Sequence, residues 1–98
     1  MTIPQLEPLL KLAASLEAYP DALDIAADIK RSVGRAATPS SAQNACEHII
    51  TMCHPKAWGD RHVRGIGTND WLAFLCTLSN LAAQCGRDIY DANRSIGA

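Results

Sequence analysis

Residues 69–90 read NDWLAFLCTLSNLAAQCGRDIY and carry the longest unbroken helical pattern in the chain. Their apolar side chains recur every three or four positions, which places them on one face of an α-helix. That face consists of Trp71, Phe74, Leu75, Leu78, Leu81, Ala82, Cys85 and Ile89. Asp70 near the start and Arg87 near the end both suit the dipole of such a helix. The stretch therefore predicts a long amphipathic helix against the core, and the polar tail 91–98 is expected to fray.

Prolines and apolar periodicity predict three more helices before this one. Pro4 and Pro8 are tolerated only in or before a first turn, so the first regular helix is expected to begin between them. Pro20 ends that helix and can open the next, and Thr38 can cap a third helix that has Pro39 at its first position. Short connections make neighbouring helices antiparallel. The predicted fold is all-α, a compact bundle of four helices at about 4–18, 20–33, 39–54 and 69–90 with one long loop, 54–68, in a single helical domain, 1–98.

Composition narrows the classes of function. The chain has 98 residues, 48% of them apolar, and a formal net charge of −1. A near-neutral chain argues against a general nucleic-acid binder, so nucleic acid is an unlikely partner. No apolar run approaches the roughly 18 residues of a membrane span, so no membrane association is expected.

Four cysteines, Cys46, Cys53, Cys76 and Cys85, fall within apolar helical stripes. Disulfide-based scaffolds are typical of shorter secreted chains, and no signal peptide is recognisable at the N-terminus. We therefore expect a cytoplasmic protein whose four thiols are reduced, face inward and behave as small apolar groups.

Charge is unevenly distributed along the chain. Residues 1–30 carry five acidic side chains against two lysines, whereas residues 31–64 carry five basic side chains against two acidic ones. Segments of opposite charge commonly complement each other within a fold. We expect the two segments to pair inside this molecule.

Five possible metal ligands, Cys46, His48, Cys53, His54 and His62, lie within seventeen residues. A structural zinc site needs four ligands that converge on one ion. The two cysteines lie on the core face of the third predicted helix, whereas the first of the histidines lies on another face. One helix cannot bring these groups together, so neither a metal site nor any other cofactor is expected.

Catalytic arrangements are equally weak in the sequence. Cys53 and His54 are neighbours, but adjacent helical side chains diverge by about 100°. The segment Gly65–Gly67 precedes a helix and follows Arg61 and Arg64, a setting in which backbone amides can hold a phosphate. No strand precedes these glycines, however, so a flexible turn is the better interpretation. The chain is not expected to be an enzyme.

Two short motifs carry a resemblance to a known family. WGDRH at 58–62 and WLAFL at 71–75 resemble the tryptophan–glycine stretch and the tryptophan-led helix of MazG-like nucleotide pyrophosphohydrolases, which are all-α. The helix of that family continues with glutamates that hold magnesium, where this chain has Thr77, Leu78 and Leu81. The resemblance thus implies a nucleotide-binding helical protein without the metal-binding carboxylates, as one alternative function.

A DNA-binding regulator is a further alternative, because residues 22–50 could form a helix-turn-helix. The connector between residues 34 and 39 is long for that motif. The third helix also lacks any Arg or Lys that could meet phosphates.

The function favoured by the sequence is a small non-enzymatic regulatory protein, an adaptor or inhibitor that binds a partner protein. Aromatic and cationic residues, the types enriched at binding hot spots, gather in and after the loop 54–68. The broad apolar faces of the first and last helices also favour a homodimer with an isologous interface. The predicted partner-binding residues are Trp58, Arg61, His62, Arg64 and Trp71.

Overall fold

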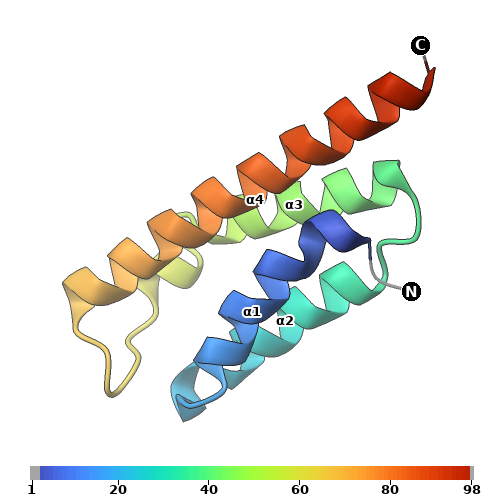
Figure 1. The fold of residues 1–98 in the computed structure, drawn as a ribbon. Helices are drawn as coiled ribbons and strands as arrows, with labels where there is room; N and C mark the ends of the chain where they lie inside the picture. Colours follow the sequence, from blue (N-terminus) through green and yellow to red (C-terminus); the bar gives the residue numbers. More distant parts are fainter. Residues whose placement is uncertain (1–2, 98) are drawn as a thin grey trace.

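The computed structural model describes residues 3–97 of the chain, with side chains through residue 92. Within these residues each of the four α-helices runs opposite to the one before it (Figure 1). The α-helices are α1 (Glu7–Leu16), α2 (Leu23–Gly34), α3 (Pro39–Met52) and α4 (Thr68–Gly97). Short 3-10 helices are η1 (Pro4–Leu6), η2 (Pro20–Ala22) and η3 (Trp58–Asp60). The predicted all-α bundle of four helices is confirmed.

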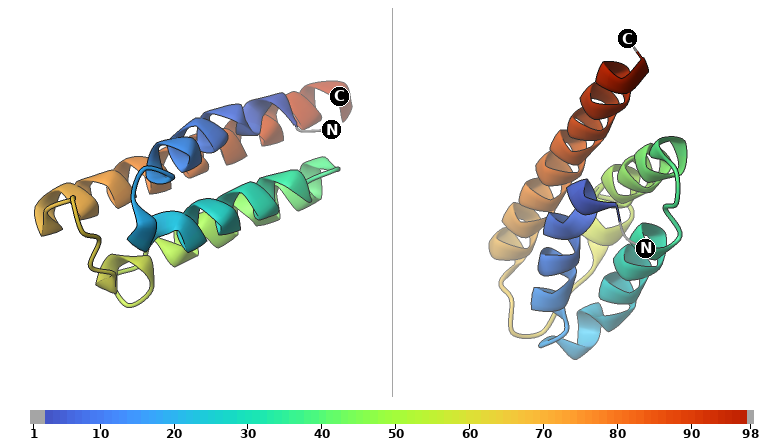
Figure 2. Two further views of the ribbon diagram at one scale, coloured as in Figure 1. Left: turned by 90° about the horizontal axis from the view of Figure 1, so that it is seen from below. Right: turned by 45° about the vertical axis from the view of Figure 1, so that its right-hand side comes forward.

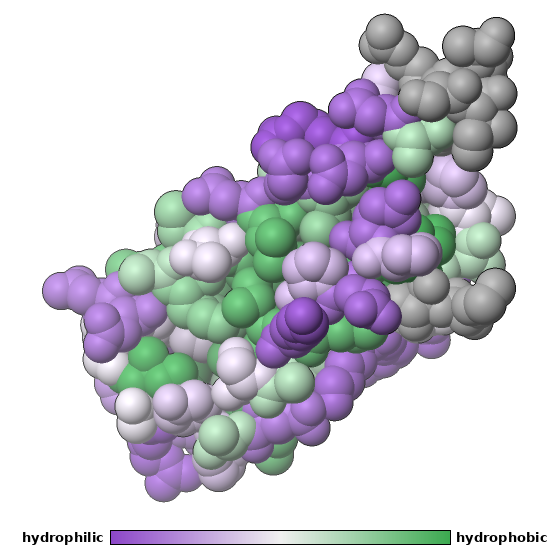
Figure 3. All heavy atoms as spheres, in the orientation of Figure 1, coloured by the Kyte–Doolittle hydropathy of each residue, from purple (hydrophilic) through white to green (hydrophobic). Residues whose placement is uncertain are grey.

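Each helix packs mainly against two neighbours around the bundle axis. Contact is most extensive between α3 and α4 and between α1 and α2, and less so between α1 and α4 and between α2 and α3. The two views of Figure 2 show this arrangement from other sides. Figure 3 shows apolar side chains between α1 and α4, with hydrophilic side chains along the outer edges of α4 and α2. None of the helices formed by residues 3–97 is long and apolar enough to cross a membrane.

The starts of the helices follow the signals in the sequence. Pro39 occupies the first turn of α3, and the Thr38 hydroxyl oxygen accepts a hydrogen bond from the Ser41 backbone N–H at 3.1 Å. The Ser41 hydroxyl oxygen in turn accepts from the Thr38 backbone N–H at 2.9 Å. This reciprocal pair satisfies two backbone donors that a helix end leaves free. The regular part of α1 begins at Glu7, between Pro4 and Pro8, as predicted.

The end of α4 differs from the prediction. The helix continues past Tyr90 to Gly97, so residues 91–97 of the polar tail are helical, while Ala98 lies outside the described residues. Gly86 lies inside the helix and does not end it. One glycine costs a helix about 1 kcal/mol relative to alanine, which the packing of a long amphipathic face outweighs. The molecule is consequently elongated, with extents of 47 × 22 × 17 Å.

The core is apolar throughout. No polar or charged side chain in the described part of the chain is buried. The contributions of α4 to the core are Trp71, Leu75, Leu78, Ala82, Cys85 and Ile89, with Phe74 and Leu81 partly buried beside them. These are the residues that the periodicity placed on the inward face.

Candidate functional site

The two tryptophans among the predicted contact residues lie in the core. Trp58 is 4% exposed and Trp71 is 2% exposed. The Trp71 indole N–H donates a hydrogen bond to the Trp58 carbonyl oxygen at 2.9 Å, and its ring stacks on Phe74 with centroids 5.7 Å apart. Indole rings bury a large apolar area, which favours this placement. In this conformation neither tryptophan presents its ring to a partner. Of the predicted contact residues, Arg61, His62 and Arg64 are left to form a surface.

The loop arginines are engaged within the molecule. Arg61 donates two hydrogen bonds of 2.8 Å to the Asp24 carboxylate and one of 3.0 Å to the Asp21 carbonyl oxygen. Arg64 donates to the Asp21 carboxylate from its backbone N–H and its Nε, both at 3.0 Å. The guanidinium groups hold the pKa values of both carboxyls below their usual range. The predicted pairing of the acidic and basic segments is confirmed for these two arginines. His62, between them in the sequence, is exposed.

The tip of the loop is also fixed. Val63 is buried, and Gly65 adopts a left-handed φ of 93°. A Cβ atom at Gly65 would lie 3.2 Å from the Tyr19 ring, which packs against the turn. The chain turns at residues 64–66, close to the turn predicted at 65–67, and the flexibility predicted for that turn stays a prediction.

The cysteines correct one prediction. All four are free, and Cys46 and Cys85 are buried as expected. Burial raises the pKa of Cys46 and of the partly buried Cys53 to about 11. Cys76, in contrast, is exposed, and the expectation that it faces inward is wrong. It follows the buried Leu75 directly, and a step of one residue turns a helical side chain by about 100°.

The five possible metal ligands point in different directions. Cys46 is in the core, whereas His48 Nε2 lies 3.0 Å from the Asp28 carboxylate on α2. His54 lies at the surface between α3 and α4, and His62 lies in the loop. Over residues 3–97 no three His, Cys, Asp or Glu side chains come together in a way that could hold a metal ion.

A groove between α3 and α4 is the feature that the sequence did not predict. It consists of two adjoining hollows of about 480 and 620 Å³ that share Ile50 as a wall. Four large apolar side chains are exposed in the described part of the chain, and three of them line this groove. They are Ile50 (36% exposed), Leu72 (44%) and Tyr90 (55%), while Leu23 (48%) lies elsewhere.

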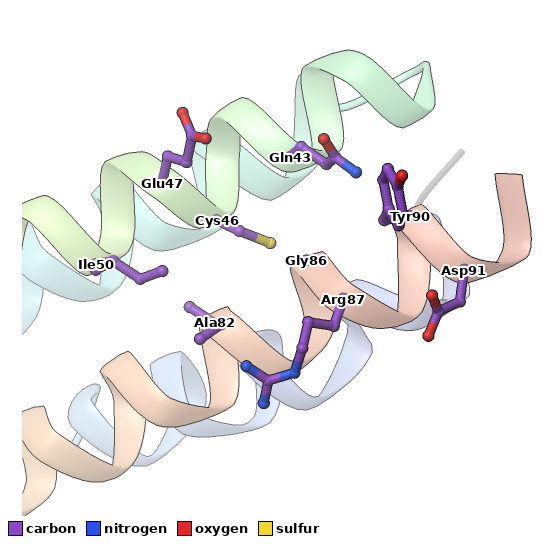
Figure 4. Close-up of a pocket in the computed structure, with 10 residues that line it drawn as sticks. Gln43, Cys46, Glu47, Ile50, Ala82, Gly86, Arg87, Tyr90 and Asp91 are labelled. Atoms are coloured by element: carbon purple, nitrogen blue, oxygen red, sulfur yellow. The ribbon is translucent and has the colours of Figure 1, made fainter. Parts of the chain in front are cut away.

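The half of the groove nearer the end of α4 has an apolar floor. Cys46 and Ile50 point from α3 toward Ala82 and Gly86 of α4, and Tyr90 stands at the end (Figure 4). A Cβ atom at Gly86 would lie 3.8 Å from the Cys46 Cβ, so α3 and α4 approach closely here without a clash. Such a surface can bind an apolar side chain or a helix.

The α4 side of the groove follows a regular stripe. Its members are Leu72, Cys76, Ser79, Ala83, Gly86 and Tyr90, which alternate steps of four and three residues. Each member comes one residue after a buried core position, so the heptad of the core is repeated on the adjacent face. The sequence does not mark this stripe as an apolar face, because its central members are small or weakly polar. Shifting the core heptad by one residue reveals it.

A second, polar cleft of about 320 Å³ lies between α2 and α3. Arg31 and Arg35 line it from α2, opposite Ser41, Asn44 and His48 of α3. Neither arginine forms an ion pair with another described residue. Asp28 also lines the cleft and lies 3.0 Å from His48 Nε2, so the lining carries two guanidinium groups about one helical turn apart and one carboxylate.

Comparison of the chain with protein-family models, with curated protein sequences and with solved structures finds no match. The resemblance to MazG-like pyrophosphohydrolases thus remains confined to the two motifs.

Proposed function

We propose that this protein is a small non-enzymatic regulator, an adaptor or inhibitor, that binds a helix of a protein in the groove between α3 and α4. The observation that supports the proposal is the clustering of Ile50, Leu72 and Tyr90 on this one groove. Exposed apolar residues scattered singly need no explanation, whereas a contiguous apolar groove with polar edges is typical of interaction sites.

The dimensions of the groove favour a helical ligand. α3 has 14 residues, which corresponds to a length of about 21 Å. The wall of α4 has large side chains at Leu72 and Tyr90 and small ones between, so a helix can approach its middle closely. An amphipathic helix with apolar residues every three or four positions matches such a groove.

The loop residues remain a predicted secondary contact. Arg64 and His62 are exposed near the start of α2, where Arg64 binds Asp21, whereas Arg61 is partly buried. Because both arginines already bind aspartates, a partner could use the loop chiefly through His62 and the outer face of Arg64.

Groove variants test the proposal against a matched control. We would use the double variant Leu72→Ser/Tyr90→Ser and, as control, Leu23→Ser, an apolar side chain of similar exposure outside the groove. Proteins captured from the native cell by the wild type would be purified and their affinities measured by calorimetry. We expect the groove variant to bind at least about tenfold more weakly, a loss of about 1.4 kcal/mol, and the control to bind normally. Equal binding by all three proteins would refute the groove assignment.

The polar cleft supports nucleotide binding as a second candidate function. Arg31 and Arg35 could hold a phosphate, since guanidinium groups bind phosphate oxygens in pairs. Titration of a nucleoside triphosphate, followed by NMR chemical shifts, should then perturb residues of this cleft. The shifts should disappear in the double variant Arg31→Gln/Arg35→Gln. Shifts elsewhere, or none, would leave the cleft without this role. DNA binding stays an untested prediction, and a salt-dependent mobility shift would be its signature.

A further inference from the structure

We infer that the helix that fills the groove is α4 of a second copy of this chain, packed antiparallel to the first across a twofold axis. The inference rests on the proposed function, because it names the occupant of the same groove. In this arrangement both copies use the same surface, as an isologous interface requires.

The stripe on α4 has the spacing and the side-chain sizes of a helix–helix seam. Steps of four and three residues are the a/d pattern by which two helices pack side by side. Leu72 and Tyr90 are the large members and stand at the two ends, while Cys76, Ser79, Ala83 and Gly86 fill the space between them. The sequence of sizes is thus nearly the same when read in either direction.

This symmetry defines the register. If the twofold axis passes beside residue 81, Leu72 meets Tyr90 of the partner subunit and Cys76 meets Gly86 of the partner subunit. Ser79 then meets Ala83 of the partner subunit, so two small side chains meet where the helices cross. Small side chains allow interaxial distances near the lower end of the usual range of about 8–10 Å.

Charge favours antiparallel over parallel pairing. The end of the groove near Tyr90 carries Glu47, Arg87 and Asp91 at its edges. The opposite end carries His54 and is followed by the exposed Lys56. Glu47, Arg87 and Asp91 together give the first end a formal net charge of −1. Antiparallel pairing brings that end to the end that carries the lysine, whereas parallel pairing would place each charged group beside its own copy. Like charges placed opposite each other weaken an interface.

The contact area that the stripe can provide corresponds to a weakly associating dimer. The stripe spans 18 steps along α4, or about 27 Å, and two helices side by side are about 20 Å wide. The projected contact area is therefore on the order of 500 Å² per copy, below the roughly 800 Å² of a standard interface. We expect a dimer that dissociates at micromolar concentrations.

Disulfide cross-linking tests the register. All variants carry Cys46→Ala, because a Cβ atom at Gly86 would lie 3.8 Å from the Cys46 Cβ of the same chain, within reach of an intramolecular disulfide. In the variant Gly86→Cys on this background, the new thiol should lie beside Cys76 of the partner subunit. Copper–phenanthroline with oxygen as the electron acceptor should oxidise these two thiols to a disulfide and yield a covalent dimer. The control variants are Gln84→Cys, on another face of α4, and Gly86→Cys combined with Cys76→Ser, and both should stay monomeric on a denaturing gel. The wild type should also stay monomeric, because its two Cys76 residues lie far apart in this register. Equal cross-linking of Gln84→Cys would overturn the register.

Sedimentation velocity tests the dimer itself. The wild type and Leu23→Ser should shift from monomer to dimer as concentration rises, and Leu72→Ser/Tyr90→Ser should remain a monomer with an unchanged circular dichroism spectrum. A wild type that is monomeric up to millimolar concentration would overturn the inference. If that monomer still loses its captured partner in the groove variant, the proposed function stands. A dimer whose groove variant keeps its partners would instead overturn the proposed function.

Discussion

Trp58 shows how a single side chain fixes the long loop. Its ring is buried, its carbonyl oxygen accepts from the Trp71 indole, and its ring meets His48 edge-on with centroids 6.4 Å apart. The neighbours Ala57 and Gly59 give no periodic pattern from which burial could be read. The burial of Trp58 depends on contacts between segments that are distant in the sequence. For this reason the sequence alone predicted it as a surface contact.

Replacement of Trp58 by alanine should destabilise the fold strongly. Truncating a buried tryptophan removes its packing and leaves a cavity, so we expect a loss of about 3–5 kcal/mol in the free energy of unfolding. Urea denaturation at neutral pH measures this loss. His62→Ala, an exposed change four residues away, should alter stability by less than about 0.5 kcal/mol. A small effect at Trp58 would mean that the loop is not anchored by its ring.

Thiol reactivity should separate Cys76 from the other cysteines. Cys76 is exposed, whereas Cys46 and Cys53 are shielded and have pKa values raised to about 11 by burial. Because the thiolate is the reactive form, dilute protein at pH 8 should show one fast reaction with an aromatic disulfide reagent and slow reactions thereafter. The variant Cys76→Ser should lack the fast phase. A fast phase that persists would contradict the burial of the remaining thiols.

Acid should weaken the contact between the loop and α2. Hydrogen bonds and charge from Arg61 lower the pKa of Asp24 in the folded state. A lowered folded-state pKa stabilises the protein above the unfolded pKa of about 3.9, and this contribution is lost as the pH falls through the folded value. Asp24→Asn should therefore lower stability at pH 7 by up to about 1 kcal/mol, the range of exposed ion pairs, and should show a smaller loss between pH 7 and pH 3. The control Asp60→Asn, also exposed, should follow the wild type in urea titrations at both pH values.

At the scale of the elements, the sequence was sufficient to predict the positions of the helices but not the groove between α3 and α4. Apolar periodicity and the signals at Pro4, Pro8 and Thr38 identified where the helices lie, because these are local properties. The continuation of α4 from Tyr90 to Gly97 was missed, since a short polar tail resembles a frayed helix end. The groove was missed because its α4 wall consists largely of Cys76, Ser79 and other small residues that no hydrophobic count singles out.

Gly86→Ala should separate the stability of the helix from the function of the groove. Alanine in a helix interior is favoured over glycine by about 0.5–1 kcal/mol. The new Cβ atom would make only an ordinary van der Waals contact with Cys46. The isolated chain should become more stable in urea denaturation at low protein concentration. The same methyl group narrows the groove, so binding of a helix there should weaken about tenfold. Gly65→Ala is the contrasting change, since its left-handed φ and the nearby Tyr19 ring should make it destabilising.

At the scale of the whole molecule, the two loop arginines are paired internally, whereas the apolar groove stays open. Arg61 and Arg64 bind α2 and its preceding turn, and Lys30 binds Glu17 at 2.6 Å. These contacts join the loop to η2 and α2, and join α2 to the C-terminal end of α1. The groove between α3 and α4 instead retains three exposed large apolar side chains. This open apolar surface is the one on which we propose that the molecule binds another helix.

Thermal unfolding should reveal whether a second copy occupies that surface. A dimer that forms only from folded chains gains stability by mass action, so its midpoint temperature rises with protein concentration. We expect this rise for the wild type and for Leu23→Ser, measured by circular dichroism from micromolar to millimolar protein. Gly86→Ala should unfold at a higher temperature than the wild type in dilute solution, because its helix is more stable, and should show little dependence on concentration, because its groove is narrower. The two curves should therefore approach or cross as concentration rises, a pattern that a general change in stability does not produce. A wild type whose midpoint is constant over this range would show that the groove is not covered by a second copy.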